Sequence, residues 1–146
     1  MPDAISRETT AEVRDACLCL HARRAARALA RRFDAALRPV GLTNGQFSLL
    51  MALNRPRPVP MAPVAALLAM DRTTLTAALK PLERDGLVAS HADPKDRRSR
   101  LLALTDAGHA ALAAATPIWR ATHEAVEATL PGGDAEGLRA ALKALC

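Results

Sequence analysis

The chain has 146 residues, enough for one domain with its own core and too few for two domains of ordinary size. Half of the residues are hydrophobic, and 33 Ala and 22 Leu supply most of that half, against six Val, two Ile, two Phe and no Tyr. This balance favours helices over a β-sandwich, a barrel or a doubly wound sheet, and the apolar content excludes wholesale disorder. The net charge of +5, carried mainly by 17 Arg, is compatible with a polyanionic partner.

The first ten residues, Met1–Thr10, are polar, and no apolar stretch of signal-peptide length follows them. The Ala- and Leu-rich runs are interrupted by Arg, Asp or His, so none of them is expected to span a bilayer. Three cysteines, two of them one residue apart, do not make the disulfide framework of a secreted domain. We therefore expect a cytoplasmic protein with no membrane partner.

A long helix is predicted from about Glu12 to Arg38, because apolar side chains recur at spacings of three and four. These side chains are Leu18, Ala22, Ala25, Leu29, Phe33 and Leu37. Five arginines lie largely off this apolar stripe, on what is expected to be a solvated face: Arg23, Arg24, Arg27, Arg31 and Arg32. Pro39 and Gly41 should end the helix.

A second helix is predicted to begin after Thr43, because Thr43 and Gln46 have the spacing of a capping box. It should run to about Leu53. The segment Arg55–Pro60 has three prolines in six residues and is expected to form a rigid, extended connector.

Two short helices are predicted next, over Pro63–Met70 and over Arg72–Asp85. Asp71 is a good cap for the second of them, and Gly86 should end it. Pro81 should bend this helix near its C-terminal end.

A β-hairpin with a long basic tip is predicted after Gly86. Its strands are Leu87–Ser90 and Arg100–Leu104, and the polar turn Asp93–Ser99 joins them. A last pair of helices should follow, over Asp106–Leu130 with a kink at Pro117, and over Asp134–Cys146. The predicted fold is mainly α with a small β-hairpin.

Two short helices followed by a basic hairpin describe a winged helix-turn-helix. The second helix fits the major groove with its N-terminal residues toward the base edges, while an Arg at the hairpin tip can enter a narrow minor groove. Asp93 and Asp96 are expected to hold the hairpin turn and to orient its Arg side chains by charge-assisted hydrogen bonds. The candidate DNA-binding residues are Arg72, Thr73, Thr74, Thr76, Lys80, Lys95, Arg97 and Arg98. The alternative interpretation is an exposed basic hairpin on a helical protein.

Several segments taken together resemble the MarR family of transcriptional regulators. They are Met70–Thr76, Leu82–Val88, Asp93–Arg98 and Leu104–Thr105. The resemblance implies a homodimer in which residues 1–40 and 105–146 form a helical dimerisation region. It also implies a winged helix-turn-helix lobe over residues 41–104, a palindromic operator in double-stranded DNA and, in most cases, repression. The terminal helices, rich in Ala and Leu, suit such a dimer, and a monomeric bundle is the alternative.

The chain departs from the family pattern in three places. Ala77 and Ala78 stand where members often have basic or polar residues, so base recognition should rest on the residues before them. Ala69 occupies a turn position where Gly is common, and the helix before it starts at Met61–Pro63 without a good N-cap. Both features are expected to lower stability rather than to affect function.

The cysteines suggest a signal, again by resemblance, because a hydroperoxide-sensing branch of the family carries a reactive Cys in its first helix. Cys19 lies similarly, although that branch activates its thiolate with Tyr hydroxyls, which this chain lacks. On an intact helix Cys17 and Cys19 would point about 200° apart and could not grip one metal ion, and the plainer interpretation is that both are small buried hydrophobic residues. If Cys146 of one subunit approaches them across a dimer, the three cysteines are candidates for a redox or soft-metal site.

Two further residues are candidates for an effector pocket, in which a small molecule would bind. His21 lies one turn from Cys17, and Trp119 lies beside Pro117, where the family resemblance suggests a pocket between helices. The plainer interpretations are a half-buried His21 and a Trp119 that anchors the core or a dimer.

No cofactor or metal motif is present, and neither a Gly-rich phosphate loop nor a Ser/His/Asp arrangement can be recognised. We therefore expect no enzyme. The predicted function is a DNA-binding transcriptional regulator, a repressor relieved by a small molecule or a thiol-reactive signal. The alternative is a helical protein-interaction module that uses the same fold without binding DNA.

Overall fold

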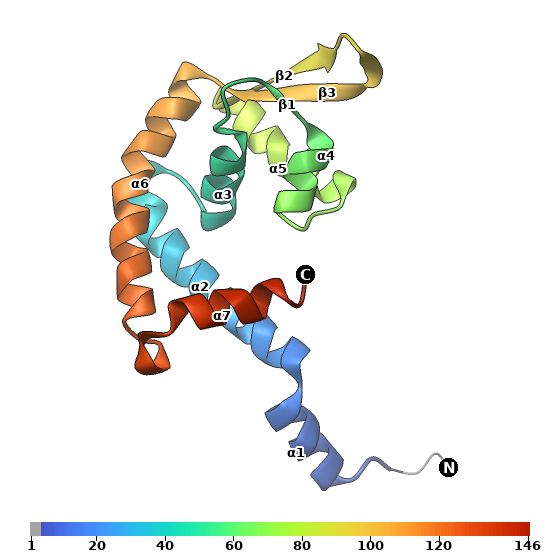
Figure 1. The fold of residues 1–146 in the computed structure, drawn as a ribbon, viewed down its shortest axis with the longest axis vertical. Coiled ribbons are helices and arrows are strands. Elements are labelled where there is room, and N and C mark those ends of the chain that lie inside the picture. The colour runs from blue at the N-terminus through green and yellow to red at the C-terminus, as the bar shows by residue number, and fades with distance from the viewer. Residues whose placement is uncertain (1–3) are drawn as a thin grey trace. The chain divides into compact units, whose positions relative to one another are not determined.

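The computed structural model describes residues 4–146, so the first three residues of the polar segment Met1–Thr10 lie outside the described part. The chain forms two compact units, one ending at Arg32 and one from Phe33 to Cys146 (Figure 1). Helix α2 runs across the boundary between them. In the part of the chain that the structure describes, no helix is both long enough and apolar enough to cross a membrane.

The N-terminal unit holds two helices instead of the single long helix predicted from Glu12. They are α1 (Arg7–Ala16) and α2 (Leu18–Leu37). The backbone leaves the helical region at Cys17, where φ is −67° and ψ is 108°. The Sγ atom of Cys17 accepts a hydrogen bond from the Leu20 amide at 3.5 Å and so begins α2 as a capping side chain would.

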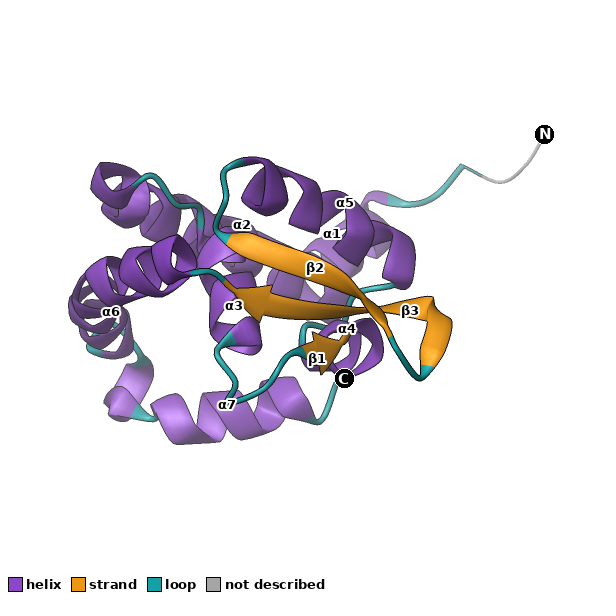
Figure 2. Ribbon diagram, turned by 90° about the horizontal axis from the view of Figure 1, so that it is seen from above, coloured by secondary structure: helices purple, strands orange, loops and turns teal. Residues whose placement is uncertain are grey.

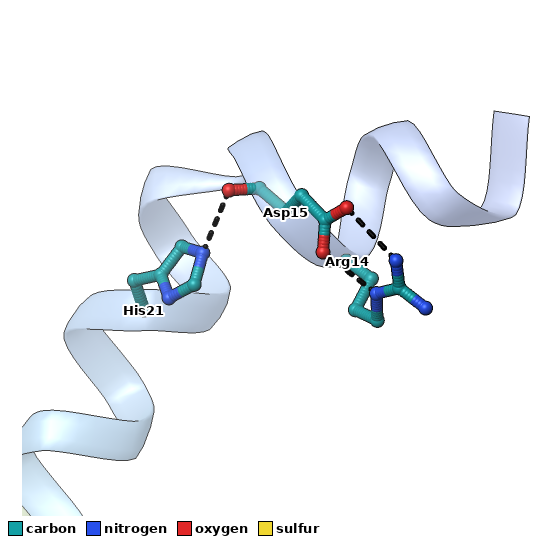
Figure 3. A network of polar contacts seen from close by, with 3 residues as sticks. All are labelled: Arg14, Asp15 and His21. Carbon is teal, nitrogen blue, oxygen red and sulfur yellow. Dashed lines mark hydrogen bonds and ion pairs between the residues drawn. The ribbon is translucent and has the colours of Figure 1, made fainter.

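A carbonyl group in the last turn of α1 also has a hydrogen-bond partner, because Nε2 of His21 donates to the Asp15 carbonyl oxygen at 3.0 Å (Figure 3). Beside it, the Asp15 carboxylate pairs with Arg14 at 2.6 Å, and this hydrogen bond lowers the pKa of Asp15. Side chains at and beside the break therefore satisfy two of the backbone groups that an interrupted helix exposes. No Pro or Gly lies at the break, so the apolar periodicity of the sequence predicted one continuous helix there.

The second unit begins with the end of α2 and then alternates helices with short strands. Its first elements are η1 (Arg38–Val40), α3 (Asn44–Leu53), β1 (Val59–Pro60), α4 (Met61–Leu67) and α5 (Arg72–Arg84). The later ones are β2 (Val88–Asp93), β3 (Asp96–Leu104), α6 (Asp106–Glu127), η2 (Pro131–Gly133) and α7 (Ala135–Lys143). In this unit the order agrees with the prediction except for the short 3-10 helices η1 and η2 and for β1, which is the last two residues of the proline-rich connector.

Polar side chains begin the helices where the sequence predicted them. Thr43 and Gln46 form the complete capping box of α3, and Asp71 caps α5. Thr105 and Asp134 cap α6 and α7 in the same way. Each cap satisfies an amide that the first helical turn leaves without a partner, so these starts are fixed by local chemistry.

The three strands form an antiparallel sheet in the order β1-β3-β2 (Figure 2). Val88 pairs with Leu104 at the base of the hairpin, and Asp93 pairs with Asp96 at its tip, after an irregularity at Ala92. The strands are longer and the turn shorter than predicted, because the polar residues of the tip continue the ladder. The end of the hairpin extends beyond the helices, as a wing would (Figure 2).

The base of the hairpin is fastened to the start of α6. Thr105 Oγ1 donates to the Gly86 carbonyl oxygen at 2.6 Å, and the Thr105 amide donates to the Leu87 carbonyl oxygen at 3.1 Å. Gly108 lies against Leu87 so closely that a Cβ atom there would overlap the Leu87 carbonyl. Helix α6 and the wing are thus held in one arrangement.

One hydrophobic core joins α3, α4, α5, the sheet and α6. Its fully buried large side chains are Leu37, Leu49, Leu50, Leu75, Leu82 and Leu102. Helices α5 and α6 continue past the prolines inside them, Pro81 and Pro117. The core fixes the positions from which α5 and the wing present their outer side chains.

A pH-dependent contact joins the end of α2 to the start of α3. The Asp34 carboxylate accepts hydrogen bonds from the backbone amide and the side-chain amide of Asn44, both at 2.7 Å. The backbone hydrogen bond is the larger cause of a pKa for Asp34 below its usual range, and the side-chain hydrogen bond adds to it.

Replacing Asp34 by Ala should lower the melting temperature at neutral pH by a few degrees. A depressed pKa in the folded state stabilises the fold above the unfolded-state pKa of about 3.9, and that stabilisation is lost as the pH falls through the folded-state pKa. Thermal unfolding of the wild type and of Asp34→Ala from pH 7 to pH 2 measures this. A difference that stays constant over the whole range would contradict the assignment.

Candidate DNA-binding interface

Helix α5 has one buried face and one exposed face. Leu75, Leu79 and Leu82 are buried in the core. The five α5 residues predicted to contact DNA are all exposed: Arg72, Thr73, Thr74, Thr76 and Lys80. Because the polar residues of the first turn of α5 are exposed, this end of the helix suits the edges of bases and a phosphate.

The start of α5 is well ordered by hydrogen bonds. Asp71 Oδ1 accepts from the Thr74 amide at 2.7 Å, and this bond holds the pKa of Asp71 below its usual range. The Thr76 hydroxyl donates to the Arg72 carbonyl oxygen at 2.8 Å. Ala77 is exposed, whereas Ala78 is half-buried and packs against the core. Of the two alanines that depart from the family pattern, only Ala77 therefore lies on the exposed face.

The turn before α5 carries the strain expected from its sequence. Ala69 has φ = 51°, in the left-handed region that favours Gly. The turn is closed by the Met70 amide, which donates to the Ala65 carbonyl oxygen at 2.9 Å. Helix α4 begins at Pro60 without a side-chain cap, as expected.

The three wing cations predicted to contact DNA, Lys95, Arg97 and Arg98, are all exposed. Asp93 Oδ1 accepts from the Lys95 amide at 2.9 Å, and Asp96 Oδ1 accepts from the Arg98 amide at 3.0 Å. The two aspartates hold the turn, as predicted. The prediction that they orient the Arg side chains was wrong, because their carboxylates bind backbone amides and, within residues 4–146, form no ion pair.

A hydrogen bond joins α5 to the wing. The Arg72 guanidinium donates through Nη2 to the Arg98 carbonyl oxygen at 3.1 Å. Arg72 and Arg98 also line one surface hollow of about 420 Å³, together with Asp96 and residues at the start of α4. Arg72 and Arg98, which the sequence placed on a helix and at a hairpin tip, therefore lie side by side at one face.

Sequence reasoning missed two features of this face. One is Arg72 as the link to the wing, which no spacing could reveal because the two residues are 26 positions apart. The other is Arg100, whose Nε donates to the Ser90 hydroxyl at 2.9 Å and whose Nη2 donates to the Ser90 carbonyl oxygen at 3.1 Å. Arg100 lies opposite Ala92 in the strand register, which the sequence does not reveal, so no signal in the sequence indicated this clamp on Ser90.

The interface cations have no acidic partners within the described residues. The ion pairs found there involve Arg14, Arg84, His123 and Arg139. The charges of Lys80, Lys95, Arg97 and Arg98 are therefore available to an external anion such as a phosphate backbone.

The three cysteines are free thiols within one chain. Cys17 is half-buried, while Cys19 and Cys146 are exposed. The interpretation that Cys17 and Cys19 are both buried was wrong in the single chain, because Cys17 is only half-buried and Cys19 is exposed. Among the residues described, no three His, Cys, Asp or Glu side chains are grouped to hold a metal ion.

Trp119 lies in the second unit between two aromatic side chains. Its ring stacks on Phe47 at a centroid distance of 6.0 Å and on His123 at 4.7 Å. It lines a hollow of about 220 Å³ with Phe33 and Leu37, and a second hollow of about 410 Å³ with Met51 and Arg120. His21, the other candidate for an effector pocket, lies in the N-terminal unit against Asp15.

Comparison with known proteins gives a consistent result. The profile of the MarR family matches residues 42–99. The structure is similar to the crystal structure of the transcriptional regulator MosR of M. tuberculosis in complex with DNA, with a TM-score of 0.81. The two sequences are 42% identical, and the alignment covers 88% of this chain and 92% of the MosR chain. The transcriptional repressor CouR bound to a 23-mer DNA duplex is 32% identical over 92% of this chain and 94% of that chain, with a TM-score of 0.75.

A curated relative matches over a shorter length. The transcriptional activatory protein BadR of Rhodopseudomonas palustris is 41% identical over 71 residues, which are 47% of this chain and 41% of BadR. The match therefore spans less than half of that relative.

Proposed function

Because this chain belongs to the MarR family of DNA-binding transcriptional regulators, we propose that it binds a palindromic operator as a homodimer and represses transcription. The observation that carries the proposal is the hydrogen bond from Arg72 to the Arg98 carbonyl, which joins the exposed face of α5 to the cationic wing. We propose no catalytic activity and no cofactor. A regulator of this kind would act on chromosomal DNA in the cytoplasm.

The proposed DNA contacts divide by chemistry. Thr73, Thr74 and Thr76 are short, exposed side chains on the first turns of α5, where they suit base edges in the major groove. Lys80, Lys95 and the two wing arginines suit phosphates or a narrow minor groove. Arg72 suits both a base contact and the support of the wing.

We propose that residues 41–104 bind DNA and that residues 1–40 and 105–146 form the dimer. Exposed leucines on and after α7 support it, because Leu138, Leu142 and Leu145 are 43%, 47% and 64% exposed in the single chain. Sedimentation equilibrium is expected to give twice the mass of the 15.5 kDa chain. A monomer at micromolar concentration would contradict the dimer.

Two routes are proposed for the signal that relieves repression. One is a small molecule bound beside Trp119, supported by the hollows that its ring lines, with His21 as a further candidate for the pocket. The other is oxidation or soft-metal binding at Cys17, Cys19 and Cys146, supported by the exposure of two of these thiols.

Non-reducing electrophoresis after mild peroxide treatment tests the thiol route. A dimer band that is absent from Cys17→Ser, Cys19→Ser or Cys146→Ser would support it. The thiol route is excluded if peroxide gives no dimer band in the wild type and if all three variants bind DNA as tightly as the wild type, both before and after peroxide.

A mobility-shift titration against the DNA upstream of the protein's own gene tests the proposed function. Binding should exceed that of a shuffled duplex and should weaken steeply as the salt concentration rises, because neutralised phosphates release counterions. Equal and weak binding to both duplexes would instead favour a protein-interaction module that keeps this fold.

Replacing Arg72 by Ala should weaken operator binding by about 1–3 kcal/mol, with a penalty that changes when the contacted base pair is changed. Anisotropy titrations against the operator and its single-base variants measure this. Lys80→Ala is the matched control, because a phosphate contact should cost the same on every sequence. A uniform penalty for Arg72→Ala would mean that Arg72 only supports the wing.

A further inference from the structure

Four exposed arginines share one side of α2, and we call them the arginine face: Arg23, Arg24, Arg27 and Arg31. The helical period places Arg27 opposite Leu18, with the other three arginines within about 60° of Arg27 around the helix axis. Arg24, Arg27 and Arg31 line a surface hollow of about 400 Å³ together with Ala25 and Ala28. The arginine face is therefore a band of positive charge about two helical turns long.

No acidic side chain neutralises this band. The sequence has no Asp or Glu between Asp15 and Asp34. The Asp15 carboxylate pairs with Arg14, and the Asp34 carboxylate accepts hydrogen bonds from Asn44. Within residues 4–146, the arginine face takes part in no ion pair. Its charge is therefore open to an external anion.

The arginine face also opposes the stability of its own helix. Arg23 and Arg27 are like charges four residues apart, and so are Arg27 and Arg31, and such pairs destabilise a helix. An anion that bridges neighbouring guanidinium groups would remove this repulsion. The same spacing that costs the free helix stability therefore favours a ligand with several linked negative charges.

The proposed dimer can leave the arginine face exposed to solvent. Leu18 and Leu29 lie on the other side of α2 and are 71% and 41% exposed in the single chain. This apolar side is the one better suited to contact a partner subunit, because apolar surface gains most when it leaves water. The charged side can then remain in contact with water and with solutes.

The chemistry of the hollow favours a chain of phosphates. Ala25 and Ala28 have no ring on which a nucleobase could stack and no polar side-chain group that could recognise one. Guanidinium groups bind phosphate oxygens through pairs of parallel hydrogen bonds. A convex helix touches a convex duplex at few phosphates, whereas a flexible chain can follow the helix past all four arginines. We infer that the arginine face binds linear inorganic polyphosphate, and the inference does not depend on DNA binding.

Calorimetric titration of the full chain without DNA, in a magnesium-free buffer, tests this with medium-chain polyphosphate, tripolyphosphate and orthophosphate as probes. Polyphosphate should bind at least about tenfold more tightly than tripolyphosphate, because a longer chain reaches more guanidinium groups at once. The double variant Arg27→Gln/Arg31→Gln should bind polyphosphate about tenfold more weakly than the wild type. Gln has nearly the helix propensity of Arg, so the variant should keep its melting temperature.

Arg32→Gln is the matched control, because Arg32 is exposed on the same helix but lies about 140° around its axis from Arg27. It should leave polyphosphate affinity within about twofold of the wild type. The inference is wrong if polyphosphate does not bind, or if it binds no more tightly than orthophosphate. It is also wrong if Arg32→Gln or the wing variant Arg97→Gln/Arg98→Gln loses as much affinity as Arg27→Gln/Arg31→Gln. An equal loss of affinity for a shuffled DNA duplex in Arg27→Gln/Arg31→Gln would make this face a DNA contact instead.

Discussion

Replacing both Arg97 and Arg98 by Ala should reduce operator affinity at least tenfold near physiological salt. Each phosphate contact that is lost removes about 0.9 from the slope of log affinity against log salt concentration. Two contacts in each protomer therefore correspond to a slope smaller by about 3.6 for a dimer with both wings on DNA. Anisotropy titrations at four or five salt concentrations measure both quantities.

The control for this variant removes the same charge elsewhere. Arg23 and Arg24 are exposed on α2, and the corresponding double Ala variant lowers the net charge equally. It should change the slope much less, because its arginines are not proposed to touch DNA. Unchanged binding of the Arg97→Ala/Arg98→Ala variant would show that the wing does not lie on the operator.

Replacing Leu75 by Ala should lower the free energy of unfolding by about 3 kcal/mol, within the range of roughly 2–5 kcal/mol for buried leucines. Leu75 is fully buried on the inner face of α5, so its loss leaves a cavity under the helix that presents the threonines. Urea denaturation at one fixed protein concentration measures the change, since a dimer's stability depends on concentration.

Lys80→Ala is the matched control on the opposite face of the same helix. It should change stability by no more than about 0.5 kcal/mol, because Lys80 is exposed. An equal loss from both variants would mean that α5 is held by something other than its buried face.

The elements that carry the DNA-binding proposal were predictable because their signals are local. Asp71 caps α5 through a hydrogen bond three residues away, and Thr43 and Gln46 form their box over the same distance. The period of Leu75, Leu79 and Leu82 fixes which side of α5 is buried, and hence which side is exposed.

The break at Cys17 was not predictable in the same way. The apolar period continues through it, and the groups that stabilise it, Cys17 Sγ and His21 Nε2, are not recognised helix-ending signals. The role of Asp93 and Asp96 in the wing was predicted only in part. The residue type indicates that each carboxylate needs a hydrogen-bond partner, but it does not indicate whether that partner is a backbone amide or a guanidinium.

Contacts between distant residues lay outside sequence reasoning altogether. The Arg72 to Arg98 hydrogen bond depends on how α5 packs against the sheet. The hollow lined by α3, α4 and the segment between them depends on how α4 lies beside α3, and no residue type in Arg55–Pro58 indicates a hollow. Tertiary packing decides both.

Hydrogen–deuterium exchange of the free and operator-bound protein tests most directly that α5 and the wing together meet DNA. Slower exchange on binding should concentrate in residues 71–77 and 94–99. If these segments exchange at the same rate with and without bound operator while others become protected, DNA binds elsewhere and the proposed interface is wrong.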